Sequence, residues 1–579
     1  MILAHYQKVK KRKGRSEAIQ FLIATHKKLN WNFPGLKLSS SDDCLKSAAK
    51  LKAESLEEKV KYAVQDSDIL TLKNLAETYL KTYGLELPLP KRVRREPSKT
   101  EILQAIAQAC NPSWWRRQLR VKQSRELEQF LRELGQVSAD HGGYVSGHTL
   151  KRREKQRVRN RENLELMEAV NQYGESFVLA ELADKNVSNP AIRRNELIVR
   201  TKGLQEQAAA LEFVGVFITQ TAPSRFHTMK KRSGGCYANP SYELGLTPRD
   251  AQAQMMGCWQ RTRAEWDRQG VRVFGFCMVE PHHDGTPHWH SILFVHPEQL
   301  RDMVRIYREY VCEENPEDLK PRMVTHKYKG GWASNGKKSK VELKTAGIQP
   351  RFDWKLMRGK DGKPGGAVEY VLKYICKNLD GAGIKGEKSD ETGGKIADSV
   401  LRVEAWKAVW GIRQFRQVGA APVGVYRELR KISEDDFDNI QDSLAPESRL
   451  QENEQKQERS EFLRIREAAD KGDFGKYVEL QGGATLRRKY QKYKNWTVRK
   501  NTSNETENRM LTLFGLIMQE GQKVVKGIKA SGKNVMSRFY DWTVRFKEAA
   551  TAANQKDAGT ASSWTCVNNC TGSIQAGAG

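Results

Sequence analysis

The sequence predicts an α+β fold, because short apolar runs typical of buried strands alternate with longer stretches of helical periodicity. Residues 271–279 and 291–295 are rich in Val, Phe, Ile and Leu, and they flank Asp284-Gly285, a dipeptide that favours a turn between antiparallel strands. Residues 213–221 are a further apolar run that predicts a buried strand. Longer segments with apolar residues three and four positions apart predict helices packed around these strands.

The composition is that of a basic chain long enough for several domains. With 579 residues we expect roughly three or four domains. Lys and Arg number 99 against 70 Asp and Glu, a net charge of +29. This excess predicts a polyanionic partner, nucleic acid ahead of an anionic membrane surface. The longest apolar runs, such as residues 510–518, are far shorter than the roughly 20 residues that span a bilayer, so we expect no membrane insertion.

Neither the first residues nor the cysteines point to export. The basic residues 8–15 follow residues 1–4 without the apolar segment of a signal peptide. Nine cysteines are scattered along the chain, and only Cys566 and Cys570 lie close together. This usage predicts free thiols in a reducing cytoplasm.

The N-terminal part is predicted to be helical and increasingly basic. Residues 1–100 show helical spacing without visible chemistry, whereas residues 101–210 predict a helical basic region that contacts DNA. Two interpretations of its aromatic and basic run are open: the rings stack on bases while Arg holds phosphate, or the Trp pair packs in a core with Arg on the wet face. The residues concerned are Trp114, Trp115, Arg116 and Arg117.

A dense run of positive charge follows at residues 151–162, where seven of twelve residues are Lys or Arg. Such a run is usually a solvated helix face. In a chain of this charge, a face that contacts phosphates is at least as good an interpretation, because each neutralised phosphate releases counterions and adds affinity.

The remaining chain divides by composition. Residues 211–432 hold the predicted strands, together with predicted helices at residues 247–269, 297–312 and 400–432 and a further possible strand at 351–355. Residues 433–475 predict a charged linker or a solvated helix, residues 476–550 a basic helical accessory domain, and residues 551–579 a disordered tail.

Residues 280–290, Glu-Pro-His-His-Asp-Gly-Thr-Pro-His-Trp-His, are the candidate metal site. Side chains alternate across a strand, so His288 and His290 are expected on one face, and Glu280 on the opposing strand can face them. One carboxylate and two imidazoles leave open positions on a divalent ion, as a Lewis-acid site requires. His282 and His283 compete with Glu280 as the third ligand. The alternative is a His pair at the surface or in the core without catalytic use.

A candidate nucleophile lies about eighty residues downstream. Residues 367–377 lack Gly and Pro and predict a helix, on which Tyr370 and Tyr374 share one face, about 6 Å apart along the axis. Lys373 and Lys377 form a second pair that would favour the ionised phenol. An aromatic stripe facing a core is the alternative. The combination with the His pair and the basic chain favours attack by tyrosine on a DNA phosphodiester, which needs no nucleotide, and the sequence has no Gly-x4-Gly-Lys-Ser/Thr loop.

Three motifs in this order resemble those of the HUH endonuclease superfamily. They are residues 217–227 with Phe-Ile-Thr-Gln-Thr and Pro-Ser-Arg-Phe-His, residues 280–290, and Tyr370-x3-Tyr374-x2-Lys377-Asn378. The closest resemblance is to the replication gene A proteins of temperate tailed bacteriophages. Segments at residues 114–120, 193–200 and 406–430 also resemble that family, so the likeness covers about residues 100–432.

This resemblance implies an HUH nickase domain with a five-stranded antiparallel sheet, metal ligands on central strands and the tyrosine helix packed across them. It implies Mg²⁺ or Mn²⁺ held by His288, His290 and Glu280, and we expect Arg225 and His227 of the first motif to contact DNA. The implied activity is a site-specific nick at a phage origin that leaves a 5′-phosphotyrosine on Tyr370 or Tyr374 and a 3′-OH for rolling-circle replication.

The resemblance also implies the setting of the reaction. We expect the bacterial host cytoplasm, single-stranded or supercoiled origin DNA as substrate, and a host helicase, single-strand-binding protein and DNA polymerase as partners. The alternatives are an HUH transposase or plasmid relaxase with the same chemistry, and a non-catalytic DNA-binding protein whose histidines and tyrosines are structural.

Overall fold

The computed structural model divides into two compact units. The first contains the described residues up to Leu134 and those within 497–525, and the second contains those within 135–496 and 526–547. The structure describes residues 6–7, 10–11, 14–29, 36–65, 67–90, 95–232, 234–319, 322–327, 339–344, 351–357, 366, 375, 379, 396–432, 452–500, 513–514, 522–530 and 533–547.

The first unit is helical, as its sequence predicts. Its helices begin at good capping residues: Ser41 and Asp68 accept backbone N–H groups, and Ser98 forms a capping box with Glu101. Buried leucines, alanines and two tryptophans from the helices between residues 42 and 133 form a common core. The helices are α2 (Arg15–Leu29), α3 (Asp42–Ala63), α4 (Ile69–Lys81), α5 (Lys99–Ala109) and α6 (Pro112–Glu133).

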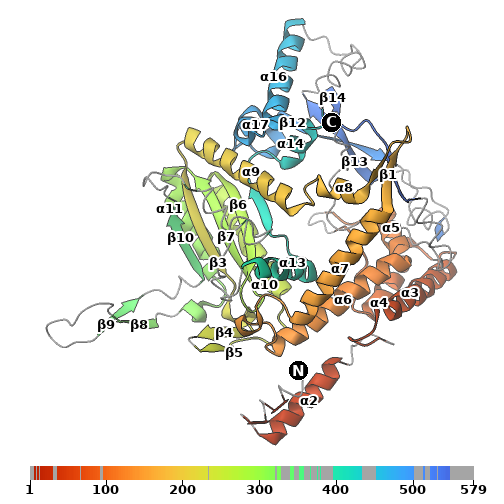
Figure 1. Ribbon diagram of the computed structural model, residues 1–579, viewed down its shortest axis with the longest axis vertical. Coiled ribbons are helices and arrows are strands. Elements are labelled where there is room, and N and C mark those ends of the chain that lie inside the picture. Colours follow the sequence, from red (N-terminus) through yellow and green to blue (C-terminus); the bar gives the residue numbers. More distant parts are fainter. Residues whose placement is uncertain are drawn as a thin grey trace. The chain divides into compact units, whose positions relative to one another are not determined.

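The second unit is built on a five-stranded antiparallel sheet, which confirms the predicted α+β fold (Figure 1). In spatial order its strands are β10 (Phe352–Leu356), β3 (Val214–Thr221), β7 (Pro287–Val295), β6 (Val273–Pro281) and β11 (Phe415–Val418). Strands β6 and β7 form the predicted hairpin. The edge strand β11 is a correction, because we predicted helix throughout residues 400–432. Gly411, with a positive φ of 65°, ends the preceding helix before the strand, and Gly419, with a φ of 60°, directly follows the strand.

Each face of this sheet packs against its own core. On one face, Phe217, Phe276 and Ile292 pack with residues of α9 (Pro190–Ala210). On the other face, Val279, Trp289 and Leu293 pack with buried residues of α10 (Pro248–Arg268), α11 (Leu300–Cys312) and α13 (Ile396–Trp410). The central strands are therefore buried on both sides, which explains their continuous apolar sequence.

The basic region at residues 101–210 is not wholly helical. It contains α7 (Gly147–Leu166) and α8 (Leu179–Asp184), and between them lie the strands β1 (Met167–Asn171) and β2 (Ser176–Val178). Strand β1 pairs with β2 and with β15 (Trp542–Phe546), far along the chain, a pairing that local periodicity could not reveal. Two further hairpins are β4 (Met229–Arg232) with β5 (Gly235–Ala238), and β8 (Arg322–Lys327) with β9 (Ser339–Lys344).

The C-terminal part differs most from the prediction. The range predicted as a charged linker or a solvated helix contains α16 (Glu452–Asp470), which follows α14 (Val423–Leu429), while its residues 433–451 lie outside the described residues. Phe462 and Ile465 of α16 are buried in the core of the sheet, so this helix is not merely solvated. Residues 476–550 were predicted to be helical, yet β12 (Tyr493–Lys500), β13 (Gln522–Ala530) and β14 (Lys533–Met536) lie there. Helix α17 (Phe474–Leu480) packs closely on α9, since a Cβ on Gly203 would collide with the backbone nitrogen of Gly475. The predicted tail at residues 551–579 lies outside the described residues.

Candidate active site

The register of the hairpin places the candidate ligands on one face of the sheet. His288 lies opposite Glu280 on β6 and opposite Thr221 on β3, and His290 lies opposite Thr219. Directly paired residues of antiparallel strands point to the same face. The prediction that Glu280 shares a face with both histidines is therefore confirmed. Oε2 of Glu280 lies 3.8 Å from Nε2 of His290.

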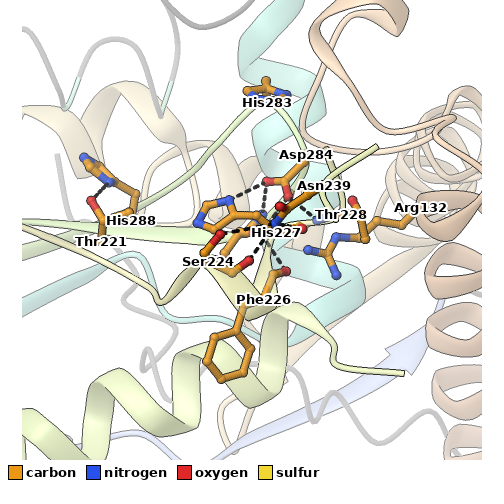
Figure 2. Close-up of polar contacts among 12 residues, drawn as sticks. Arg132, Thr221, Ser224, Phe226, His227, Thr228, Asn239, His283, Asp284 and His288 are labelled. Carbon is orange, nitrogen blue, oxygen red and sulfur yellow. Dashed lines mark hydrogen bonds and ion pairs between the residues drawn. The ribbon is translucent and has the colours of Figure 1, made fainter. Parts of the chain in front are cut away.

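Two more histidines than the predicted pair complete a cluster. The ring centroids of His288 and His290 are 4.5 Å apart, and the ring of His282 is 4.4 Å from that of His288. The ring of His227, which we predicted to contact DNA, is 5.2 Å from that of His282. His283, the other competitor for a ligand position, lies on the far side of Asp284 (Figure 2), with Nδ1 4.0 Å from Cys236 Sγ.

Threonine hydroxyls on β3 orient the two central imidazoles. Thr221 Oγ1 is 3.0 Å from His288 Nδ1 (Figure 2), and Thr219 Oγ1 is 3.2 Å from His290 Nδ1. A hydroxyl that accepts a hydrogen bond from Nδ1–H leaves the lone pair on Nε2 for a cation. Sequence reasoning missed this role, although the alternation Thr219-x-Thr221 beside His288-x-His290 carries the signal.

The environment keeps His288 in its neutral form. Burial lowers its pKa well below the ordinary value, and repulsion from His282, His290 and His227 lowers it further. The ring of Phe217 stacks on that of His290 at 5.3 Å, so the cluster borders directly on the apolar core. A neutral imidazole is the form that binds a metal ion, so His288 does not need to lose a proton at neutral pH.

A buried carboxylate fixes the tip of the hairpin. Asp284 is fully buried and accepts hydrogen bonds from the backbone N–H of Thr228 at 2.9 Å and from Thr286 Oγ1 at 3.0 Å. Its Oδ1 is 3.4 Å from Nδ1 of His227 (Figure 2), and this contact helps to hold the ring that lies against His282. Gly285, with φ of 81°, completes the predicted turn, and Trp406 Nε1 donates to its carbonyl.

The nitrogen and oxygen atoms of His288, His290 and Glu280 are of the kinds that bind a divalent cation, although they are not yet close enough together to coordinate one. Imidazole nitrogens with a correctly oriented carboxylate are ligands for such ions. Within the part of the chain that the structure describes, no three His, Cys, Asp or Glu side chains already stand in metal-binding geometry. His288, His290 and Glu280 would have to draw closer together to hold an ion.

The predicted nucleophiles Tyr370 and Tyr374, with Lys373 and Lys377, lie outside the described residues. Two of their neighbours are described: Ile375 and Leu379 are both helical and both buried. They belong to the same core as Phe217, Met278 and Ile292. These three residues lie on the face of the sheet that carries His288 and His290, which we call the histidine face.

The predicted stacking of bases on Trp114 and Trp115 is wrong. Their side chains are 4% and 0% exposed in the helical core, and Trp115 Nε1 donates to the Ala109 carbonyl, so neither ring is available to a base. The alternative, a packed Trp pair, is what the structure contains. Arg116 binds Asp42; burial raises the pKa of this carboxyl, but hydrogen bonds from Arg120 and Arg116 bring it below its usual range.

The other predicted DNA contacts are partly engaged. Arg117 is half-buried on α6. Arg225 pairs with Glu243 at 3.2 Å and Glu314 at 3.6 Å, and its guanidinium lies over the Phe226 ring. Contact of Arg117 or Arg225 with DNA stays a prediction.

Among the described residues, no helix is long and apolar enough to cross a membrane.

Comparisons with known proteins agree on one family. Residues 40–382 match the family model described as Bacteriophage replication gene A protein. The chain is 31% identical over 517 residues to the Replication gene A protein of Escherichia phage 186, covering 88% of this chain and 67% of the relative. It is 31% identical over 496 residues to that of Escherichia phage P2, covering 83% of this chain and 57% of the relative.

A further relative carries an activity in its name. The "Probable replication endonuclease from prophage-like region 1" of Salmonella typhi is 29% identical over 488 residues, 83% of this chain and 54% of the relative. The chain thus spans between about half and two thirds of the length of these relatives. No solved structure matches it.

Proposed function

The chain belongs to the bacteriophage replication gene A protein family, and we propose that it is a site-specific endonuclease that nicks one DNA strand at a phage origin. The observation that carries this proposal is the face of the sheet that holds His288 and His290: the two imidazoles are oriented by Thr221 and Thr219, and Glu280 lies beside them. The endonuclease named among the relatives supports the same activity.

In the proposed reaction, the phenol oxygen of Tyr370 or Tyr374 attacks the phosphorus of a phosphodiester. The new bond is P–O(Tyr), the bond that breaks is P–O3′, and the proton lost by the phenol is balanced by the proton gained at the released 3′-OH. The product is a 5′-phosphotyrosine with a free 3′-OH, which can start rolling-circle synthesis. Because one phosphate ester replaces another, the step is reversible and needs no nucleotide.

The residues of this chain have separate parts in the proposal. His288, His290 and Glu280 hold Mg²⁺ or Mn²⁺, which when bound draws charge from a phosphate oxygen. A tyrosine phenol has a pKa of about 10 and is otherwise protonated near neutral pH; the positive charges of Lys373 and Lys377 favour its phenolate form. One observation supports this assignment: Ile375, the residue that follows Tyr374 in the sequence, is buried in the same core as Phe217 and Ile292.

The test is a nicking assay on a supercoiled plasmid that carries the origin of the parent replicon. With Mn²⁺ we expect a nicked circle with protein on its 5′ end. Tyr370→Phe combined with Tyr374→Phe should abolish both, because no phenol remains to attack. Tyr173→Phe, which removes the hydroxyl of a side chain that is 76% exposed, is the matched control and should nick normally. Undiminished nicking by the double variant would show that the nucleophile is assigned wrongly.

We further propose that a host helicase, single-strand-binding protein and DNA polymerase extend the 3′-OH. Adding these proteins to the nicked product should yield displaced single strands, and their absence should leave the nicked circle unchanged.

A further inference from the structure

Basic side chains gather at the edge of the sheet formed by β11. We call Arg153, Arg157, Arg193, Lys407 and Arg413 the cationic cluster; they come from α7, α9, α13 and the segment before β11. Arg153 and Arg157 lie 2.8 Å and 3.3 Å from the two carboxylate oxygens of Glu404. One carboxylate is thus shared by two guanidinium groups on a neighbouring helix.

The inner members of the cluster stand among other cations. The guanidinium of Arg193 lies over the Phe415 ring at 5.9 Å, and the carboxylate nearest along its helix, Glu196, is already bound by Arg427 at 2.7 Å and Arg200 at 3.4 Å. Burial and then the repulsion of Arg193 lower the pKa of Lys407 to about 8.

The local charge is therefore far from balanced. Among the described residues, the five cations of the cluster together with Arg200 and Arg427 face two carboxylates, those of Glu196 and Glu404. Positive charge that is half-buried and in excess is unfavourable in the free protein. An anion that enters the cluster would relieve this cost, and phosphate oxygens are good acceptors for arginine.

The cluster borders on the candidate active site. Phe415, beneath Arg193, pairs with Met278, and Met278 pairs with His290 across the next strand. Two strand spacings of roughly 4.8 Å put the backbone of Phe415 about 10 Å from that of His290. A strand whose phosphate lies at the histidines can therefore reach the cluster with a neighbouring part of its backbone.

We propose that the cationic cluster is a phosphate-binding site for the single DNA strand that is cut at the histidines; this rests on the proposed function. A polymer fits better than a free anion, because α7 continues the positive charge outward with exposed Lys151, Lys155 and Arg159 and has no buried residue. A largely exposed helix with this many basic side chains is suited to lie along a charged backbone.

The test measures binding without cleavage. Binding of fluorescein-labelled oligothymidylate to the full chain in EDTA is followed by anisotropy at several salt concentrations. Each lost phosphate contact lowers the slope of log affinity against log salt by about 0.7, so Arg193→Gln with Lys407→Gln should lower it by about 1.4. The control is Arg301→Gln with Arg308→Gln, which removes the same charge from exposed sites on α11, over the other face of the sheet.

An equal change of slope in both double variants, or no change in either, overturns the proposal. If Arg193→Gln with Lys407→Gln does not fold, Arg157→Gln replaces it, because this side chain is 55% exposed and its loss leaves the cores intact; its slope should fall by about 0.7. Failure of the proposed function is seen separately, as nicking that persists without Tyr370 and Tyr374, and it does not alter the salt slope.

Discussion

The two faces of the five-stranded sheet are made by alternate residues of the same strands, yet they have opposite characters near the hairpin tip. On β7, His288 and His290 point to one face, whereas Trp289 and Ser291 point to the other, where Trp289 packs with Trp259. The histidine face ends in a cluster of titratable groups, and the tryptophan face is closed by α10, α11 and α13. Alternate residues of β7 therefore have different roles: His288 and His290 form the candidate site, and Trp289 packs in the core of the other face.

The largest expected effect is on the histidine face. His288→Ala with His290→Ala should reduce Mn²⁺-dependent nicking about a thousandfold or more, because two ligands are lost, while thermal unfolding stays close to that of the parent. Nicking rates and melting curves of the same preparations measure both. Full metal-dependent activity in this variant would mean that the hairpin is not the metal site.

Trp289→Ala should have the reverse effect. The side chain is 1% exposed and its Nε1 donates to Gln252 at 2.9 Å, so its loss should lower the free energy of unfolding by about 3–5 kcal/mol. Urea denaturation gives this value, and nicking per folded molecule should fall much less than in the histidine variant. An unchanged urea midpoint would contradict the division between the faces.

A smaller effect is expected from the hydroxyls that orient the imidazoles. Thr219→Val with Thr221→Val keeps the side-chain shape but removes both partners of Nδ1, and should raise the Mn²⁺ concentration for half-maximal nicking about 10–100-fold. Thr262→Val, which removes a buried hydroxyl on the tryptophan face, should leave the Mn²⁺ requirement unchanged. A similar shift in both variants would rule out a specific orienting role.

The smallest effect concerns Lys407, at the edge where the faces meet. Its pKa of about 8 lies below the ordinary 10.5, so between these values the unfolded chain holds a proton that the folded chain has released. Stability contributed by this group therefore rises with pH across that window and is lowest below it. Lys407→Met should flatten this part of the profile and raise the melting temperature slightly near pH 7. A profile identical to that of the parent would show that Lys407 is not destabilised.

The sheet could be predicted because its signals are local. The apolar runs around Asp284-Gly285 predict the hairpin, and the alternation of His288 and His290 predicts that they share one face; both are confirmed. The participation of Thr219 and Thr221 depends on the pairing of β3 with β7, which brings together residues about seventy positions apart. Periodicity alone does not specify such a register.

The errors share a physical cause. Trp114 and Trp115 next to arginines look like a nucleic-acid surface, but the energy of burying two indoles decided their position. The charged residues around α16 hide Phe462 and Ile465, which are sufficient to anchor the helix. Strands β12 to β14 are rich in lysine, so their weak apolar alternation was read as helix.

The close packing of Gly203 on Gly475 has a consequence for dissecting the protein. Helix α17, α9 and the sheet contribute to one core, which also contains Ile375. Helix α17 is therefore part of the core of the candidate catalytic domain, although it lies beyond residue 432. A fragment that ends at residue 432, where the sequence resemblance ends, would lack α16 and α17 and would expose the apolar core residues that they cover. A fragment meant to cut DNA should therefore retain α16 and α17, and Gly475→Val in the whole chain should mimic the truncation.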